Sequence, residues 1–302
     1  LHTRGNFEGY LAAGTSQKWL EVHGDTHFTH FYSRYGAGLQ RKFFAHFLKG
    51  ENSGWDQQPK VSLNIRRPGE KFELRAENEW PLARTQWTPY YLDPAAMELN
   101  PKGAAATTTM AYDTQGDGIP FLTPVVDHDV EVTGPVAAKV WLSSETADAD
   151  IFLALRLYDP SGKEIAFIGS NDPRTPIGLG WLRASHRKTD PNKSKPYRPW
   201  HTHDEDWPLT PNQPVELDVE IWPTCIVIPA GYRLGLNVRG KDYEYDGTDA
   251  GVAHAPYPMK GVGPFLHRNP KDRPSEVFGG KNTLHFSAEM KPYLLLPIIP
   301  KK

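Results

Sequence analysis

The spacing of apolar residues changes near residue 60. Before that point, apolar side chains recur three or four residues apart, at helical spacing, on either side of one short apolar run. A first helix is predicted between an N-cap at Asn6 and a stop at Gly14. A longer helix is predicted over about residues 29–49, with Gly36 and Gly38 weakening its middle.

The apolar run between these helices, Lys18–Val22, predicts a strand. It shows little polar alternation, so we expect a strand buried on both faces, as in a parallel sheet flanked by helices. The strand leads into a turn, Gly24-Asp25-Thr26, which presents His27. Catalytic groups of such sheets lie on loops past the carboxyl ends of the strands, where a histidine is well placed to act as a general base. One strand is not a sheet, so residues 1–50 are not expected to fold alone.

From Lys60 onward the apolar period becomes two, which is typical of half-buried strands. The segments with this period are 61–65, 136–142, 151–157, 215–221 and 234–238. Two stretches rich in Pro, Gly and His, Asp172–Trp207 and Tyr243–Asn282, are expected to be long loops. Many half-buried strands with long polar connections predict a β-sandwich of jelly-roll type.

Charge and composition exclude several kinds of partner. The formal net charge of the 302 residues is −2, which gives no electrostatic reason to expect nucleic acid or an anionic membrane surface. The apolar run Tyr293–Pro300 is too short to span a bilayer. The single cysteine, Cys225, excludes an internal disulfide framework and favours the cytoplasm over secretion, with the compartment left open. The chain begins at Leu1 with no initiator methionine, so we expect a piece of a longer protein, and no signal-peptide pattern follows.

Three histidines surround the predicted turn. His23, His27 and His30 have a spacing that would suit zinc, but the turn between them argues against a helix that aligns them. A structural alternative packs these rings among Phe28 and Phe31. We predict neither a metal nor a cofactor here.

Three other polar clusters carry weaker signals. Residues 201–206, HTHDED, are typical of a solvated patch that tolerates metals. Residues 113–118 imitate the start of a calcium loop, but Pro124 stands where the bidentate glutamate should be. Asp148 and Asp150 have the chemistry to bind a cation, although loops before strands commonly carry such residues.

Several catalytic motifs are missing from the sequence. It contains no G-x-S-x-G elbow, glycine-rich phosphate loop, H-E-x-x-H motif or paired cysteines. Cys225 lies in a strand-like segment and is expected to be buried rather than nucleophilic. An alternative class is a carbohydrate-binding or interaction module that stacks sugars on Trp181, Trp200 or Trp207, although such rings more often pack in cores or domain interfaces.

Taken in order, several stretches resemble the C-terminal part of the X-prolyl dipeptidyl-peptidase and cocaine-esterase (CocE/NonD) group of α/β-hydrolases, which includes α-amino-acid ester hydrolases. The matching stretches are residues 20–27, 41–50, 134–136, 148–152, 180–187 and 230–234. The resemblance covers nearly all 302 residues, although the family often has His where Tyr232 stands.

The resemblance implies a mixed fold and a serine hydrolase. Residues 1–58 would be the C-terminal end of an α/β-hydrolase domain, and residues 59–302 an all-β jelly-roll (galactose-binding-like) sandwich. His27 would be the triad histidine, which takes the serine proton and returns it to the leaving group; His23 is a competitor.

The triad order in α/β-hydrolases is Ser, Asp, His, so the nucleophile, the acid and the oxyanion donors should lie before Leu1. Glu8 and Glu21 fall on the predicted helix and strand and are unconvincing replacement acids. We therefore expect an acyl esterase or X-Pro dipeptidyl-peptidase-like portion, inactive by itself, that needs a missing N-terminal hydrolase segment or a partner chain. Ester, peptide and β-lactam substrates stay open, as does a homo-oligomer.

Overall fold

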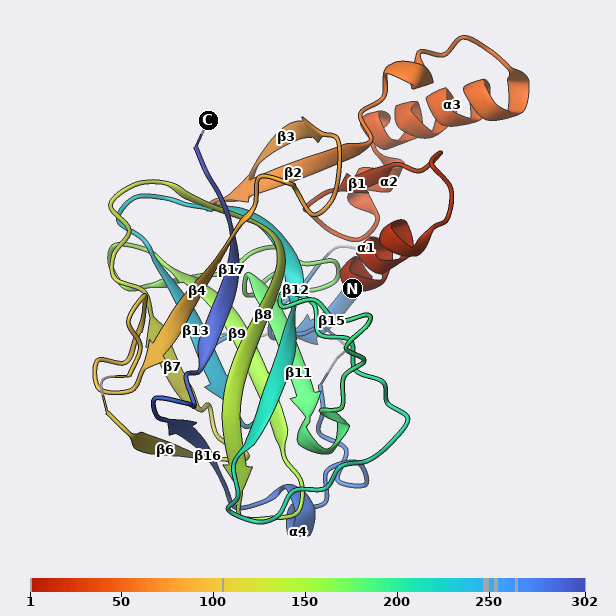
Figure 1. Cartoon of the computed structure of the whole chain (residues 1–302). Helices are drawn as coiled ribbons and strands as arrows, with labels where there is room; N and C mark the ends of the chain where they lie inside the picture. The colour runs from red at the N-terminus through yellow and green to blue at the C-terminus, as the bar shows by residue number, and fades with distance from the viewer. Residues whose placement is uncertain (1, 105, 247–249, 253–254, 264–265, 302) are drawn as a thin grey trace.

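The computed structural model of the chain describes residues 2–104, 106–246, 250–252, 255–263 and 266–301 (Figure 1). Its helices are α1 Thr3–Ala12, α2 Thr29–Tyr32, α3 Arg34–Lys49 and α4 Ser275–Phe278, with 3-10 turns at Trp55–Gln57 and Ala184–His186. Its strands are β1 Leu20–Val22, β2 Val61–Arg67, β3 Lys71–Glu77, β4 Gln86–Asp93, β5 Glu98–Asn100, β6 Thr108–Asp113, β7 Ile119–Leu122, β8 Val130–Ser144, β9 Asp150–Tyr158, β10 Glu164–Ile165, β11 Gly178–Arg183, β12 Val215–Ile228, β13 Arg233–Arg239, β14 Ala250–Val252, β15 Ala255–Met259, β16 Lys281–Phe286 and β17 Tyr293–Ile299. Within the described ranges, β14 and β15 pair with each other and the other strands join one large sheet.

The large sheet folds into two layers around the main hydrophobic core. Strands β4, β17, β8 and β12 pair in that order in one layer, and β7, β13, β9 and β11 pair in the other (Figure 1). Strand β5 joins the layers, because it pairs with β4 on one side and with β7 on the other. Side chains from both layers, such as Leu142 of β8 and Leu155 of β9, are fully buried between them. This apolar burial is the main term that holds the layers together.

The five segments with an apolar period of two all form strands, namely β2, β8, β9, β12 and β13, as predicted. The prediction of long loops was wrong in part, since β11 lies inside the first stretch and β14, β15, α4 and the start of β16 inside the second. Strand β11 is hard to predict because glycines take the place of the apolar side chains. A Cβ on Gly180 would collide with the carbonyl of Glu220 in β12, so the close approach of β11 to β12 requires glycine.

The N-terminal helices differ from their predictions at the ends. Helix α1 begins at Thr3, with His2 as its N-cap, so Asn6 lies inside the first turns rather than at the cap. The long helix is interrupted at Ser33, whose hydroxyl accepts the Gly36 N–H at 3.0 Å and caps α3. Gly36 is required there, because a Cβ would collide with the carbonyl of His30 in α2. Gly50 ends α3 in the left-handed conformation, as predicted.

Strand β1 is shorter than predicted, and only Leu20 in it is buried, so the expectation of a strand buried on both faces was wrong. It pairs in parallel with β2, with Leu20 opposite Val61. The sheet therefore continues across the boundary expected at residue 58. A second hydrophobic cluster includes residues of β1 and β2. In this cluster Phe7 of α1 stacks on Trp80 with a ring-centroid distance of 4.2 Å.

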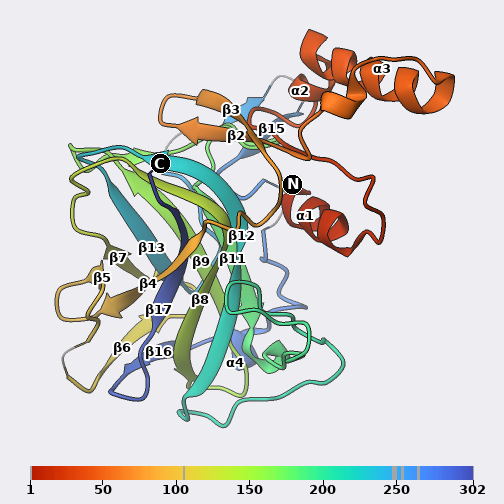
Figure 2. The same cartoon turned by 45° about the horizontal axis from the view of Figure 1, so that its top comes forward.

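Helix α3 stands away from the rest of the molecule in two views, while α1 lies close to the β-sheets (Figures 1 and 2). Helix α1 is held there by ion pairs from Arg4 to Glu220 and from Arg198 to Glu8. Among the described helices, none is both long and apolar enough to cross a membrane.

Candidate functional site

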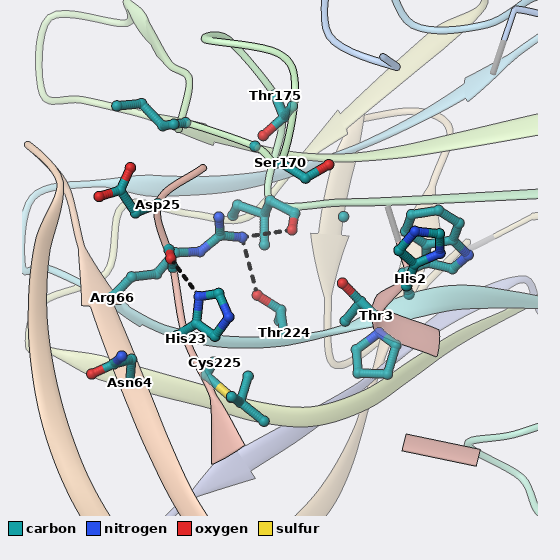
Figure 3. Close-up of a pocket in the computed structure, with 18 of the residues that line it drawn as sticks. His2, Thr3, His23, Asp25, Asn64, Arg66, Ser170, Thr175, Thr224 and Cys225 are labelled. Atoms are coloured by element: carbon teal, nitrogen blue, oxygen red, sulfur yellow. Dashed lines mark hydrogen bonds between the residues drawn. The ribbon is translucent and has the colours of Figure 1, made fainter. Parts of the chain in front are cut away.

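A cavity of about 360 Å³ lies where the N-terminal segment meets the β-sheets. We call it the junction cavity, and we call residues 23–28, between β1 and α2, the histidine loop. The walls of the cavity come from α1, the histidine loop, β2, the segment 168–179, the middle of β12 and residues 261–263. Segments far apart in the sequence therefore enclose one space (Figure 3).

His27 lines the junction cavity at the place predicted from the sequence, on the loop past the carboxyl end of β1. Its backbone N–H donates to the carbonyl of Ser170 at 2.8 Å. Its ring lies 5.4 Å from the ring of His2 and 4.5 Å from that of Phe28, measured between centroids. The β-sheet part of the chain thus holds the backbone of the predicted catalytic histidine.

His23 and His30 have a different arrangement. Their rings stack with a centroid distance of 4.2 Å. His30 Nε2 lies 2.7 Å from Glu21, which also accepts a hydrogen bond from the Tyr35 hydroxyl at 3.2 Å. Burial, and then the charge of Glu21, raises the pKa of Tyr35 to about 12. The described residues contain no group of three side chains placed to hold a metal, so the three histidines do not converge.

His23, the other candidate for the catalytic role, also lines the cavity, but its ring forms a hydrogen bond within the histidine loop. Its Nδ1 donates to the carbonyl of Gly24 at 2.9 Å. The two carboxylates considered as replacement acids also have partners, because Glu21 binds His30 and Glu8 accepts from Arg198 at 3.0 Å. These contacts give no support to Glu8 or Glu21 as a replacement acid, in keeping with the expectation that neither is convincing.

Arg66 of β2 is a cavity residue that the sequence did not single out. Its Nη2 donates to the carbonyl of Ile177 at 2.7 Å and to the Thr224 hydroxyl at 3.3 Å (Figure 3). The guanidinium lies 4.4 Å from the centre of the Phe167 ring. Burial lowers the pKa of Arg66 to about 10, so it stays protonated at neutral pH. An alternating strand pattern predicts a solvent-facing side chain at this position, and the residues that contact its guanidinium come from segments distant in the sequence.

The weaker clusters have structural partners. Asp148 accepts from the backbone N–H of Ser185 at 2.9 Å, and Asp150 binds Arg183 and Arg273, each at 2.9 Å. In the segment 113–118, Asp113 accepts from Gln115 N–H at 2.7 Å and closes its own turn, while Asp117 pairs with Arg239. These contacts explain the acidic residues without a cation.

The histidine-rich segment 201–206 is partly enclosed. His201 is half-buried, and its burial lowers its pKa to about 4. His203 Nδ1 lies 3.0 Å from His186 Nδ1, and Lys188 binds Asp204 at 3.1 Å. The segment is thus held in place more firmly than a free solvated patch.

The tryptophans of the carbohydrate-binding alternative each contact other side chains. Trp181 lies 5.4 Å from the ring of Trp222, Trp200 carries Lys193 above its ring, and Trp207 donates to Glu205 at 3.0 Å. Cys225 is buried, as predicted, and burial raises its pKa to about 12.

Comparison with known proteins confirms the resemblance. A putative serine esterase of Mycobacterium bovis is 26% identical over 243 residues, which cover 67% of this chain and 35% of that protein. Cocaine esterase of a Rhodococcus species is 22% identical over 302 residues, covering 87% of this chain and 46% of that protein. A crystal structure of a CocE/NonD family hydrolase from Staphylococcus aureus is 28% identical, with a TM-score of 0.89 over 99% of this chain and 52% of its own.

The chain therefore spans about half, or less, of the length of these relatives. An α-amino acid ester hydrolase, 17% identical with a TM-score of 0.55, shares the fold over 86% of this chain and 44% of its own. Residues 53–294 match the family described as the X-Pro dipeptidyl-peptidase C-terminal non-catalytic domain. The chain belongs to this family, and it carries the mostly β-sheet, non-catalytic C-terminal domain of CocE/NonD-type hydrolases.

Proposed function

We propose that this chain is the histidine-bearing C-terminal portion of a serine hydrolase that cleaves small esters or peptides. His27 acts as the general base, and the nucleophile and acid come from polypeptide outside these 302 residues. The observation that carries the proposal is the position of His27, on the loop after β1 and at a cavity that is also lined by α1, by residues of β2 and β12, and by the segment 168–179. In this role the imidazole takes the serine proton and returns it to the leaving group.

We further propose that residues 1–58 are the last strand and helices of an α/β-hydrolase domain, and that residues 59–302 are a jelly-roll, galactose-binding-like sandwich. Among the described strands, β1 pairs only with β2 and stands at the end of the sheet. Its second edge is placed to pair with a further parallel strand of the hydrolase domain, which would leave no unpaired edge.

The apolar surface of α2 and α3 supports the same proposal. Phe31, Tyr32, Phe44 and Leu48 are between 50% and 76% exposed. Large exposed apolar groups close together mark an interaction surface. The relatives are about twice as long as this chain, so the occupant we propose is the remainder of the hydrolase domain, on the same polypeptide or on a partner chain.

The first experiment is intact mass measurement with N-terminal sequencing of the natural protein. We expect a species that extends before Leu1, or a partner chain that carries G-x-S-x-G. In that natural protein, His27→Ala should lower kcat for p-nitrophenyl acetate by about 10²–10⁴-fold, the usual contribution of general acid–base catalysis. His23→Ala is the matched control, since His23 is on the same loop, and should change kcat far less.

The 302-residue chain by itself should show no serine-hydrolase turnover. Robust ester cleavage by this chain, abolished by His27→Ala, would overturn the proposal that the nucleophile and the acid lie outside these 302 residues. Full activity of the His27→Ala variant in the natural protein would overturn the role of His27.

A further inference from the structure

The junction cavity contains a positive charge that the chain does not balance by direct contact. An arginine has five N–H groups. Arg66 uses two of them, both on Nη2, for Ile177 and Thr224. In the described part of the chain these are its hydrogen-bond acceptors, so Nε–H and the two Nη1–H groups have none. In Figure 3 the guanidinium nitrogen without a dashed line points away from Thr224.

The carboxylates that line this space or act on Arg66 by their charge have other partners. Glu21 accepts from the Tyr35 hydroxyl at 3.2 Å and lies 2.7 Å from His30 Nε2. Glu70, whose charge acts on Arg66, accepts the Ile168 N–H at 2.8 Å. Asp172 accepts from the backbone N–H groups of Arg174, Gly261 and Gly263 at 2.9, 2.5 and 3.2 Å. Asp25 accepts from Thr26 N–H at 2.6 Å. None of them forms an ion pair with Arg66 within the described residues.

The guanidinium of Arg66 is partly buried, and its unused donors are open to the cavity, where a ligand can reach them. Partial removal of a charge from water is costly, and a partner of opposite charge that accepts its hydrogen bonds offsets this cost. The contacts of Nη2 and the Phe167 ring fix the orientation of the group, so the remaining donors are held in place before a ligand arrives. Such preorganised donors suit a small anion.

We propose that the junction cavity is a binding site for a small molecule that carries one carboxylate, and that Arg66 recognises this carboxylate. The apolar part of the ligand would lie against Phe7, Val22 and Leu179, which also line the cavity. A single carboxylate is favoured over phosphate because the cavity wall already includes three carboxylates, Glu21, Asp25 and Asp172. If the proposed hydrolase function holds, the acid is part of its substrate, since His27 lines the same space.

The test is an NMR titration of the 302-residue chain, labelled with ¹⁵N-arginine, against benzoate and its neutral counterpart benzamide. Benzoate should shift the Arg66 Nε–H resonance and bind more tightly than benzamide. Arg66→Gln should weaken benzoate binding by about 10- to 100-fold, the usual effect of losing a hydrogen bond to a charged group. Arg66→Lys, which keeps the charge, should recover part of the loss.

Arg67→Gln is the matched control, because Arg67 is the next residue of β2 and forms a partly exposed ion pair with Asp129 at 2.8 Å. It should leave benzoate binding within about twofold, as expected for a surface pair. Benzamide or inorganic phosphate binding as tightly as benzoate would overturn the proposal. These two measurements use the unmutated chain, so they do not depend on whether a variant folds. The readout is binding, so a failure of the hydrolase proposal would not change this result.

Discussion

The contact between Gly24 and Phe72 should fix the histidine loop against the β-sheets. A Cβ added to Gly24 would overlap the edge of the Phe72 ring, at separations below those that real Cβ atoms show. Phe72 comes from β3 and is 38% exposed, so it is held less firmly than a core side chain. Gly24→Ala therefore tests whether the loop and the ring are mutually constrained.

Two effects of opposite sign determine the size of the change. Forcing a methyl group against a packed neighbour costs about 1–3 kcal/mol. Replacing Gly by Ala outside the left-handed region also stabilises by about 0.4–1 kcal/mol, because the unfolded chain has fewer conformations to lose. Gly24→Ala should therefore lower the free energy of unfolding by about 0.5–2 kcal/mol in total.

In a Phe72→Ala background the overlap is absent, so Gly24→Ala should become neutral or slightly stabilising. The double-mutant cycle should give a coupling free energy of about 1–3 kcal/mol. Urea unfolding followed by tryptophan fluorescence measures the free energies, and amide hydrogen exchange at His27 reports on the Ser170 contact. Gly14→Ala is the control, since its Cβ would meet nothing within 4 Å.

Free energies that add within about 0.5 kcal/mol would refute the reasoning, because independent sites behave in that way. So would a Gly24→Ala variant as stable as the unmutated chain with unchanged His27 exchange. Either result would mean that Phe72 turns aside freely and that the loop is positioned by other contacts.

Two further predictions follow from burial. The pKa of His201 is lowered to about 4 in the folded state. Between about pH 6.5 and pH 4 the unfolded chain therefore binds more protons than the folded chain. The free energy of unfolding should fall by up to about 3 kcal/mol as the pH falls through that range. Urea unfolding at pH 7 and pH 4.5 should show a smaller loss for His201→Gln than for the unmutated chain; an equal loss would contradict the prediction. The buried Cys225, with its pKa raised to about 12, should resist Ellman's reagent at pH 8 until urea unfolds the chain; immediate stoichiometric labelling would contradict this.

The sequence predicted the strands whose burial is local and regular. Val61, Leu63 and Ile65 alternate with polar residues, and they lie in β2 with their side chains fully or almost fully buried. It failed where the approach of distant backbones decides the residue type, as at Gly180, whose neighbour is the carbonyl of Glu220 about forty residues away. Periodicity contains no information about such a contact.

The same distinction applies to the site. His27 was predicted because a strand, a turn and a histidine follow one another within ten residues, so local sequence and the resemblance both point to it. Arg66 could not be predicted, because Ile177 and Thr224, which hold its guanidinium, come from segments more than a hundred residues away. A side chain is recognisable from the sequence when its neighbours are near in the chain, and the junction cavity is enclosed mainly by neighbours that are not.

These contacts between distant segments bear on what a non-catalytic domain contributes to a hydrolase. The β-sheet part supplies the Ser170 carbonyl that binds the His27 backbone, the Phe72 ring that covers Gly24, and the Arg66 guanidinium in the cavity wall. None of these groups needs to react for the site to depend on them, because a general base is effective only when it is held within hydrogen-bond reach of its proton. The domain can therefore be non-catalytic in its chemistry and still determine where the predicted catalytic histidine lies.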